Sequence, residues 1–429
     1  MRTARITLVA AAVGVGMLGW TTAPAAPAVG TGAVAGGAVE TELPLRELVK
    51  PNRLRIGTAV DMAALAGDST YRDRIATEFS SVTAENVMKW DTIEPQPGLL
   101  DFGPADELVD FARENRQAVR GHVLLWHNQL PAWLTDGVAT GEITPGELRD
   151  ILRRHITDVV SHFRGRIYQW DVVNEVIDDD AQLRDTIWLR ELGPGYIADA
   201  FRWAHAADPA AKLYLNDYNV EGVNPKSDAY HELARQLLAD GVPVHGMGVQ
   251  GHLGVQFGFF PASNVAANLG RFEDLGLETS VTEADVRMLL PADTVKLQAQ
   301  AQGYNTLLQG CLLARRCTSF TVWGYTDRYS WVPGFFEGEG AANILDEDFA
   351  PKPAYLALQA TLALAGGGAG RRCSAALGRQ RGALGQRAEL GPGDVRVDGL
   401  GADVHAEPAV DTRHHPVAAV LGIRVGGGT

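Results

Sequence analysis

The sequence predicts a (β/α)8 barrel, also called a TIM barrel, over residues 41–365. Within them, eight short β-prone runs alternate with longer helical patterns, an alternation that is typical of a parallel sheet with crossover helices. A doubly wound open sheet alternates in the same way. Its first strand is usually followed by a Gly-rich phosphate-binding turn, however, and we find none in this sequence. The barrel is therefore the favoured fold class.

The β-prone runs are taken in chain order and are expected to form the barrel wall. They span residues 54–60, 79–86, 118–126, 167–175, 211–217, 244–252, 278–286 and 319–327. Candidate helices lie between them, for example over residues 145–163 and 228–241. In the first of these, Leu148, Leu152 and Ile156 recur at helical spacing and predict a face that packs on the sheet.

The N-terminal region has the pattern of an exported protein. Arg2 and Arg5 precede an apolar stretch that begins at Ile6, and residues 23–25 are small, as at a cleavage site. The stretch is short for a membrane span. We expect a secretory signal peptide over residues 1–26, a flexible Gly/Ala-rich spacer over 27–40, and a secreted, extracellular protein.

Residues 366–429 differ in composition from the barrel region. They hold eight Arg, no Lys and no Phe, Tyr or Trp. A segment without aromatic residues has little means of packing a core or stacking on a sugar. We interpret it as a disordered, linker-like tail. A second interpretation, that a reading-frame error has replaced an accessory domain, is left open.

The overall charge and the cysteines narrow the function classes. The formal net charge is −14, from 38 basic and 52 acidic residues, which argues against binding nucleic acid or an anionic membrane surface. Cys311 and Cys317 are close enough in sequence to close a small loop, which would leave Cys373 over. No Cys/His spacing resembles a zinc site, so we expect no metal and no cofactor.

Seven of the expected strands end in hydrogen-bonding or aromatic residues. Chemistry in such a barrel belongs at these C-terminal ends. Amides and imidazoles suit the hydroxyl groups of a sugar, and indole rings suit its apolar face. In chain order the candidates are Glu85, Asn86, Lys89, His122, Trp126, His127, Gln129, Asn174, Glu175, Asn216, Tyr218, Gln250, His252, Glu283, Asp285, Trp323 and Trp331.

Two of these residues carry the carboxyl groups that glycosidic cleavage needs. One group must hold a proton for the leaving oxygen, and the other must be ionised to attack the anomeric carbon or activate water. Glu175 follows Trp170 and an apolar run, surroundings that favour the neutral acid. Glu283 has His252 as a possible partner, which favours the anion.

At this point the motifs resemble those of a known family. The segments "ENVMKW", "GHVLLWHNQLPAWL", "WDVVNE", "LYLNDYN", "VQGHL", "TEADVR" and "VWGYTDRYSW" together resemble the glycoside hydrolase family 10 endo-β-1,4-xylanases. The resemblance runs from about Leu45 to about Leu364, and the motifs occur in the family's order. It implies xylan and xylo-oligosaccharides as substrates, a retaining mechanism and a monomer.

The resemblance also implies a role for each matching residue. Glu175 is the general acid/base and Glu283 the nucleophile, with carboxyl groups about 5–5.5 Å apart. Asn174 bonds the sugar 2-hydroxyl, and His252 holds Glu283 with Asp285 behind it. The remaining substrate-binding residues are Glu85, Asn86 and Lys89 for the next sugar, His122, Trp126, Gln129, Trp323 and Trp331 around the cleaved sugar, Gln250 close by, and Tyr218 with Asn219 on the leaving-group side.

Three further points follow from the resemblance. The Cys311–Cys317 pair matches a disulfide common in the family. A second disulfide found in some members has no counterpart, because no cysteine lies near residues 211–252. The segment "AGGGAGRRCS" begins like the linker to a carbohydrate-binding module, but no recognisable module follows it.

Two other functions compete with xylan hydrolysis. A retaining β-1,4-glucanase uses the same pair of glutamates, but bulk from Gln129 and Trp331 would crowd the hydroxymethyl group of glucose and favours xylose. A non-catalytic sugar-binding barrel typically loses one catalytic carboxyl, and both are present here.

Overall fold

The computed structural model describes residues 43–366. The expected signal peptide, the spacer and, apart from Gly366, the tail lie outside the described residues, so these expectations stay predictions.

Eight parallel strands close into a barrel, which confirms the expected fold class. Their bounds are β1 (Arg55–Val60), β2 (Ser81–Ala84), β3 (Ala118–Gly121), β4 (Ile167–Asn174), β5 (Lys212–Asp217), β6 (Gly246–Val249), β8 (Glu278–Leu289) and β9 (Cys317–Val322). Each pairs in parallel with the next, and β9 pairs with both β8 and β1, which closes the ring. Two short strands pair with the C-terminal part of β8. These are β7 (His252–Gly254), which is parallel to it, and β10 (Glu339–Gly340), which is antiparallel.

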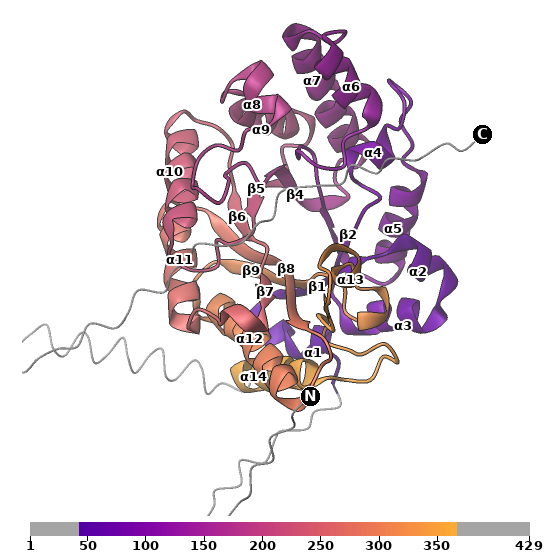
Figure 1. Ribbon diagram of the computed structural model, residues 1–429, viewed down its shortest axis with the longest axis vertical. Coiled ribbons are helices and arrows are strands. Elements are labelled where there is room, and N and C mark those ends of the chain that lie inside the picture. The colour runs from indigo at the N-terminus through magenta and orange to yellow at the C-terminus, as the bar shows by residue number, and fades with distance from the viewer. Residues whose placement is uncertain (1–42, 367–429) are drawn as a thin grey trace, which may run out of the picture. The chain divides into compact units, whose positions relative to one another are not determined.

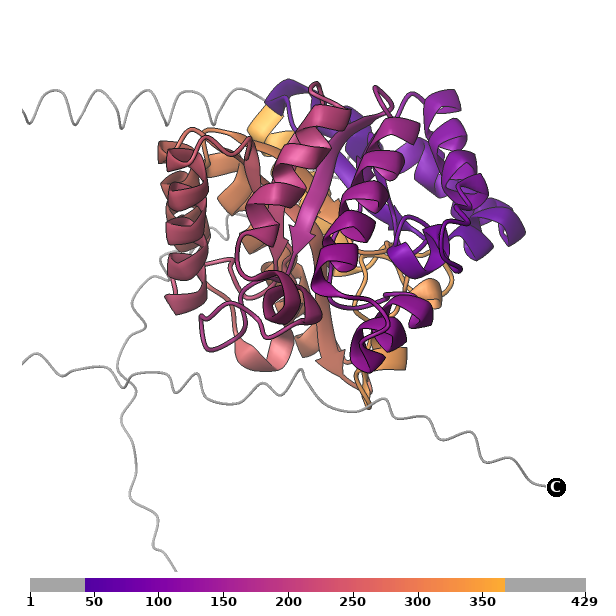
Figure 2. The same cartoon turned by 90° about the horizontal axis from the view of Figure 1, so that it is seen from above.

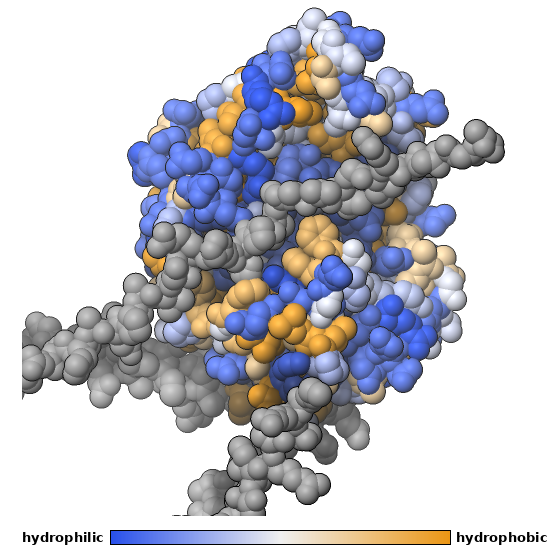
Figure 3. Space-filling model, viewed as in Figure 1, coloured by the Kyte–Doolittle hydropathy of each residue, from blue (hydrophilic) through white to orange (hydrophobic). Residues whose placement is uncertain are grey.

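Helices surround the strands in Figure 1, and Figure 2 shows them on the outside of the sheet. Figure 3 shows hydrophilic side chains gathered over α10, as expected of a helix that buries its other face. The helices are α1 (Leu45–Leu48), α2 (Met62–Gly67), α3 (Ser69–Glu78), α4 (Trp90–Ile93), α5 (Gly103–Glu114), α6 (Ala132–Thr140), α7 (Pro145–His162), α8 (Ile187–Leu192), α9 (Tyr196–Ala207), α10 (Pro225–Ala239), α11 (Ala262–Asp274), α12 (Thr294–Leu313), α13 (Val332–Phe335) and α14 (Pro353–Gly366), with 3-10 turns η1 (Lys50–Asn52), η2 (Val255–Phe257) and η3 (Asp327–Tyr329).

Local sequence signals explain where several helices begin. Thr144 accepts a hydrogen bond from the main-chain N–H of Glu147, whose carboxylate accepts one from Thr144 in return. This capping box satisfies two donors at the start of α7, and Pro145 takes the first helical position, where no N–H is needed. None of the helices described is long and apolar enough to cross a membrane.

Several expected strands have different bounds in the structure. The run 319–327, for example, is strand only from Cys317 to Val322. The run 118–126 is strand only as far as Gly121, so the expected end was wrong. Beyond it the main chain leaves the regular ladder and brings His122 to the barrel interior, where it is 2% exposed. The run 244–252 is broken at Gly251, whose φ of +82° is left-handed and suits glycine. β6 therefore ends at Val249, and His252 begins the separate strand β7.

Contacts between distant parts of the chain close the fold at its two ends. Glu78 Oε2 accepts hydrogen bonds from the Leu45 N–H and from the Tyr355 hydroxyl, both at 3.0 Å. Gln359 on α14 donates to the Leu43 carbonyl at 3.1 Å.

The Cys311–Cys317 disulfide expected from the resemblance is present. It joins α12 to the first residue of β9.

Candidate active site

Four neighbouring strands bring the two glutamates into one site. Glu175 directly follows β4, and Glu283 lies within β8. Asn216 of β5 and Gln250, just after β6, lie between them in the order of the barrel wall. Since all four strands are parallel, their polar side chains collect at the same end of the barrel.

A chain of amide groups connects the two carboxylates. Gln250 Nε2 donates to Glu175 Oε1 at 3.2 Å and lies 3.2 Å from the Asn174 amide. The Asn174 amide is 2.9 Å from that of Asn216, which donates to Glu283 Oε1 at 2.7 Å. Both glutamates therefore belong to one hydrogen-bonded network, which orients them relative to each other.

Glu283 is buried, with 3% of its surface exposed, and is nevertheless held as an anion. Burial alone would raise its pKa, but the charges and hydrogen bonds of His122, His252 and Arg120 outweigh burial and lower the pKa to about 2. Arg120 lies 3.6 Å from Glu283 Oε1, and His252 Nε2 lies 3.3 Å from Oε2. A buried carboxylate of this kind is available as a nucleophile at any ordinary pH.

His252 links Glu283 to a second acidic residue. Its Nδ1 lies 2.9 Å from Asp285 Oδ2, which also accepts a hydrogen bond from Trp331 Nε1 at 2.8 Å. Burial would lower the pKa of His252, but Asp285 and Glu283 outweigh this effect and raise the pKa to about 10. His252 is thus a cation between two carboxylates, and it fixes the orientation of Glu283.

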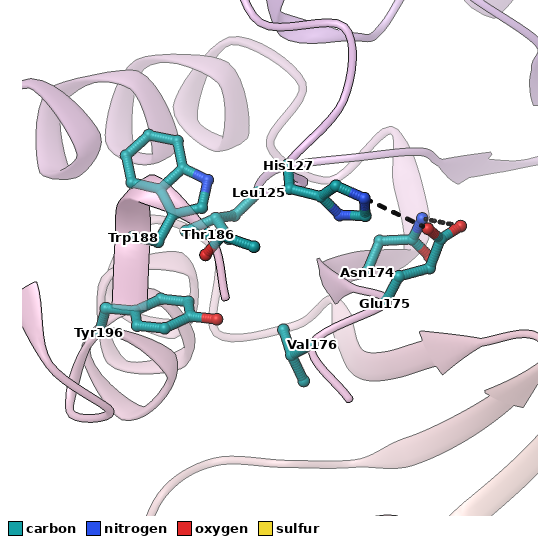
Figure 4. Close-up of a pocket in the computed structure, with 8 residues that line it drawn as sticks. All are labelled: Leu125, His127, Asn174, Glu175, Val176, Thr186, Trp188 and Tyr196. Atoms are coloured by element: carbon teal, nitrogen blue, oxygen red, sulfur yellow. Dashed lines mark hydrogen bonds and ion pairs between the residues drawn. The ribbon is translucent and has the colours of Figure 1, made fainter. Parts of the chain in front are cut away.

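Glu175 lies in a more mixed environment, shown with its neighbours in Figure 4. The side chains of Asn174 and His127 point toward its carboxylate, and His127 Nε2 lies 4.0 Å from Oε2. Burial and the cations Arg184 and Lys226 together lower the pKa of His127 to about 4, against the opposing effect of Glu175. His127 is therefore neutral above that pH and does not neutralise Glu175 with a full positive charge.

A buried ion pair beneath the site was missed by the sequence analysis. Arg120 Nε donates to Asp171 Oδ1 at 3.3 Å, and a second guanidinium nitrogen contacts Asp171 Oδ2. His122 Nδ1 lies 2.8 Å from the same carboxylate. The sequence shows opposite charges inside two otherwise apolar strand runs, residues 118–126 and 167–175, which indicates that each charge has a buried partner but does not identify that partner.

The same cluster offers the geometry of a metal site but not its charge balance. Donor atoms of His122, Asp171 and Glu283 lie within 4.8 Å of one another. The guanidinium of Arg120 already contacts both carboxylates, so the negative charge is compensated by a cation of the chain itself. The expectation that no metal or cofactor takes part stays a prediction.

The residues expected to bind the next sugar form a second cluster at one side of the site. Lys89 Nζ donates to Asn86 at 3.0 Å and to Gln129 at 2.6 Å, and it lies 5.2 Å from the ring of Trp126. Burial and the charge of Asp61 raise the pKa of Glu85 to about 7, against the effect of Lys89. These contacts place the cluster beside the neutral His127 and the wall formed by Trp126.

The remaining candidates lie on the other sides of the glutamates. Trp323 packs edge-on against His122, with ring centres 5.2 Å apart. Trp331 packs against His252 at 5.2 Å. The hydroxyl of Tyr218 accepts a hydrogen bond from Arg184 at 3.0 Å, and Lys226 Nζ lies 3.5 Å from the centre of its ring. Arg184 and Lys226 were not singled out from the sequence.

Comparisons with known proteins agree with this geometry. The model of glycosyl hydrolase family 10 matches residues 44–361. An endo-1,4-beta-xylanase of Agaricus bisporus is 43% identical over 309 residues, which are 72% of this chain and 90% of that protein. Endo-1,4-beta-xylanase B of Thermotoga neapolitana is 42% identical over 324 residues, which are 74% of this chain and 91% of that protein. The crystal structure of xylanase 10B from Thermotoga petrophila RKU-1 in complex with xylobiose is similar with a TM-score of 0.72 and 41% identity, over 75% of this chain and 98% of that one.

Proposed function

The chain belongs to glycosyl hydrolase family 10, and on this premise we propose that it hydrolyses internal β-1,4-xylosidic bonds of xylan and of xylo-oligosaccharides with retention of anomeric configuration. One observation carries the proposal. A buried anion, Glu283 within β8, and a second carboxyl group, Glu175 directly after β4, belong to one barrel and share a network of amides. The family, the curated relatives and a related structure with bound xylobiose support the substrate class.

The first step forms a covalent glycosyl-enzyme. Glu283 Oε attacks the anomeric carbon, and the glycosidic bond breaks as Glu175 gives its proton to the leaving oxygen. His252 and Asn216 hold the Glu283 carboxylate in place through contacts of 3.3 Å and 2.7 Å. Asn174, between the two glutamates, bonds the 2-hydroxyl of the sugar as positive charge develops on the ring.

The second step releases the sugar. Glu175, now ionised, takes a proton from water, the water oxygen attacks the anomeric carbon, and the bond to Glu283 breaks. Both glutamates return to their starting states. Two inversions at the same carbon give net retention. This mechanism requires the carboxyl groups to lie about 5–5.5 Å apart.

Two bulky side chains support xylose over glucose. Trp331 is anchored through its indole nitrogen to Asp285, and Gln129 is anchored to Lys89. Since both residues are held by buried charged groups, they cannot readily move aside for a hydroxymethyl group. Hydrolysis of arabinoxylan and of carboxymethylcellulose should therefore be compared, with NMR of the first-formed anomer. Fast release of short β-configured xylo-oligosaccharides is expected, whereas comparable rates on carboxymethylcellulose would contradict the proposal.

Substitutions of the two glutamates separate their roles. Glu283→Ala should reduce turnover on xylan by at least about 10⁴-fold, and azide should restore activity on an aryl glycoside with inverted product. Glu175→Gln should slow substrates with poor leaving groups far more than activated aryl glycosides, because only the former need the proton. Normal xylan hydrolysis by Glu283→Ala would overturn the nucleophile assignment.

The proposal includes where and in what form the enzyme acts. The residue pattern over 1–26 supports export, so we expect the protein outside the cell, where xylan is available. We also expect a monomer that binds neither nucleic acid nor a membrane surface, in keeping with its net charge of −14. Light scattering of the purified protein and its recovery from the culture medium would test these points.

A further inference from the structure

The main chain of Glu175 has a conformation that is unusual for its residue type. Its φ is +57°, in the left-handed region, which residues other than glycine adopt only when the surrounding structure holds them there. This conformation turns the chain at the end of β4 and sets the direction in which the carboxyl group leaves the backbone. Whatever fixes this turn therefore also fixes the position of the general acid/base.

Arg184 contacts the turn because the chain after Glu175 forms a hairpin, over residues 177–183, that leads back to the end of β4. Asp178 begins the hairpin by accepting two main-chain hydrogen bonds at 2.9–3.0 Å, and Ile177 pairs with Leu183 across it. The return brings Arg184 back to the strand end, where its main-chain N–H donates to the Val176 carbonyl at 2.8 Å. Its side chain then donates from Nε to the Glu175 carbonyl at 2.7 Å.

The other guanidinium nitrogen extends the contact to the leaving-group side. Arg184 Nη2 donates to the Ile177 carbonyl at 3.1 Å and to the Tyr218 hydroxyl at 3.0 Å. One planar cation thus bonds the backbone of Glu175 and the side chain that is placed to receive the departing sugar. A lysine at this position could supply the positive charge, but it lacks the planar set of N–H donors with which the guanidinium bonds several acceptors at once.

We propose that Arg184 is a positioning residue, which holds the left-handed backbone of Glu175 and couples the general acid/base to Tyr218. The inference rests on the proposed function. Two other contacts help to hold the turn, the Glu175 N–H to the Asn216 carbonyl at 2.9 Å and the Val176 N–H to the Tyr230 hydroxyl at 3.0 Å. The first is a main-chain contact that no side-chain substitution removes, and the buried Tyr230 hydroxyl also bonds Asp217, so the partly exposed Arg184 is the partner best suited to substitution.

The test compares three variants on two substrates. Arg184→Met removes the donors and keeps the unbranched stem, Arg184→Lys keeps one charged donor, and Arg190→Met makes the same change in an exposed ion pair with Asp185. Xylotetraose has a sugar leaving group that needs the proton from Glu175. 2,4-Dinitrophenyl β-xylobioside has a leaving group that needs none, so it reports nucleophilic attack alone.

For Arg184→Met we expect kcat/KM on xylotetraose to fall by about 10²-fold, the cost of a small misplacement of a catalytic group. On the dinitrophenyl substrate kcat/KM should change by less than about threefold. Azide should raise kcat on the latter and give a product of retained configuration, because base catalysis by Glu175 is impaired as well. Arg184→Lys should be intermediate on xylotetraose, and Arg190→Met should match the parent enzyme.

Equal losses on both substrates, or no loss on xylotetraose, would overturn the inference. If Arg184→Met does not fold by circular dichroism, Arg184→Lys is assayed in the same way, and a loss equal on both substrates again counts against it. Failure of the proposed function gives a different result. In that case the parent enzyme does not hydrolyse xylotetraose, or Glu175→Gln slows both substrates equally.

Discussion

The charge states at the site depend on a few individual side chains. Glu283 remains ionised in a buried position because His252, His122 and Arg120 oppose the cost of burial. His252 in turn is a cation because it lies between Glu283 and Asp285. Each group is therefore stabilised by the other, and removal of either leaves a buried charge with fewer partners.

This coupling predicts a pH-dependent loss of stability in His252→Gln. The pKa of His252 rises on folding from 6.5 to about 10, so its contribution to stability is full below pH 6.5 and declines as the pH rises through about 10. The pKa of Glu283 falls from 4.5 to about 2, so its contribution is full above pH 4.5 and declines as the pH falls through about 2. Both contributions are full between pH 4.5 and 6.5.

Urea unfolding at pH 5.5 and pH 9.5 measures this effect. Relative to the parent protein, His252→Gln should lose more unfolding free energy at pH 5.5 than at pH 9.5, by on the order of 2 kcal/mol. His231→Gln, on α10 with its ring packed near Phe272, serves as the control and should show no such difference. An equal loss for His252→Gln at the two pH values would mean that the charge of His252 does not stabilise the fold.

Single residues at the strand ends could be identified from sequence, but their partners could not. Glu175 is recognisable because it ends an apolar run with a carboxyl group, and Glu283 because it lies near the end of a β-prone run with Asp285 two residues on. Arg120 and Asp171 are 51 residues apart in the sequence. Neither run indicates that both side chains point into the barrel interior and lie close enough there to pair. Arg184 was missed for a similar reason, because its functional contact is with a main-chain carbonyl, which has no sequence signature.

At the scale of elements, the strand β8 carries two acidic residues of the candidate site, Glu283 and Asp285. It is the longest strand described, and beyond Glu283 and Asp285 it continues to pair with β7 and β10. Its neighbour β9 begins at Cys317, at the opposite end of the barrel from Trp323 and the site. The disulfide therefore anchors the start of a site-bearing strand without touching the site.

This separation predicts that the disulfide affects stability but not catalysis. In Cys311→Ala/Cys317→Ala we expect the unfolding free energy to fall by about 2 kcal/mol, the chain-entropy value for so short a loop. The values of kcat and KM on xylotetraose at 25 °C should stay within about twofold, because the change lies far from the reacting groups. Reduction of the parent protein with dithiothreitol should reproduce the stability loss. A large fall in kcat would show instead that the site depends on the link.

The number and order of the elements were more predictable than their ends. The sequence shows eight β-prone runs, and each contributes a strand to the barrel. The ends of several runs were wrong because tertiary contacts decide them. Residues 122–126 look like a continuation of β3 by composition, yet their main chain bonds irregularly to β4. The sequence shows a glycine at residue 251, but it does not show that this glycine adopts a left-handed φ and interrupts the strand.

For the whole described molecule, the first and last helices complete the barrel. α14 packs on α12 and α1, with Leu358 and Leu362 fully buried. The hydrogen bonds of Gln359 to the Leu43 carbonyl and of Tyr355 to Glu78 tie the two ends together. Every residue of the candidate site lies within 43–366, so this part of the chain contains its own core, closure and active site.

We therefore expect residues 43–366 alone to fold and to act on soluble substrates. The value of kcat/KM on xylotetraose should lie within about twofold of that of the full chain, because an independent core supports independent folding. A chain that ends at Lys352 removes α14 and exposes the apolar partners of Leu358 and Leu362, so it should aggregate or lose cooperative unfolding. Assays of both chains beside the full protein, with thermal unfolding followed by circular dichroism, decide the matter. If the 43–366 chain were folded but inactive, residues outside it would have to contribute to the site.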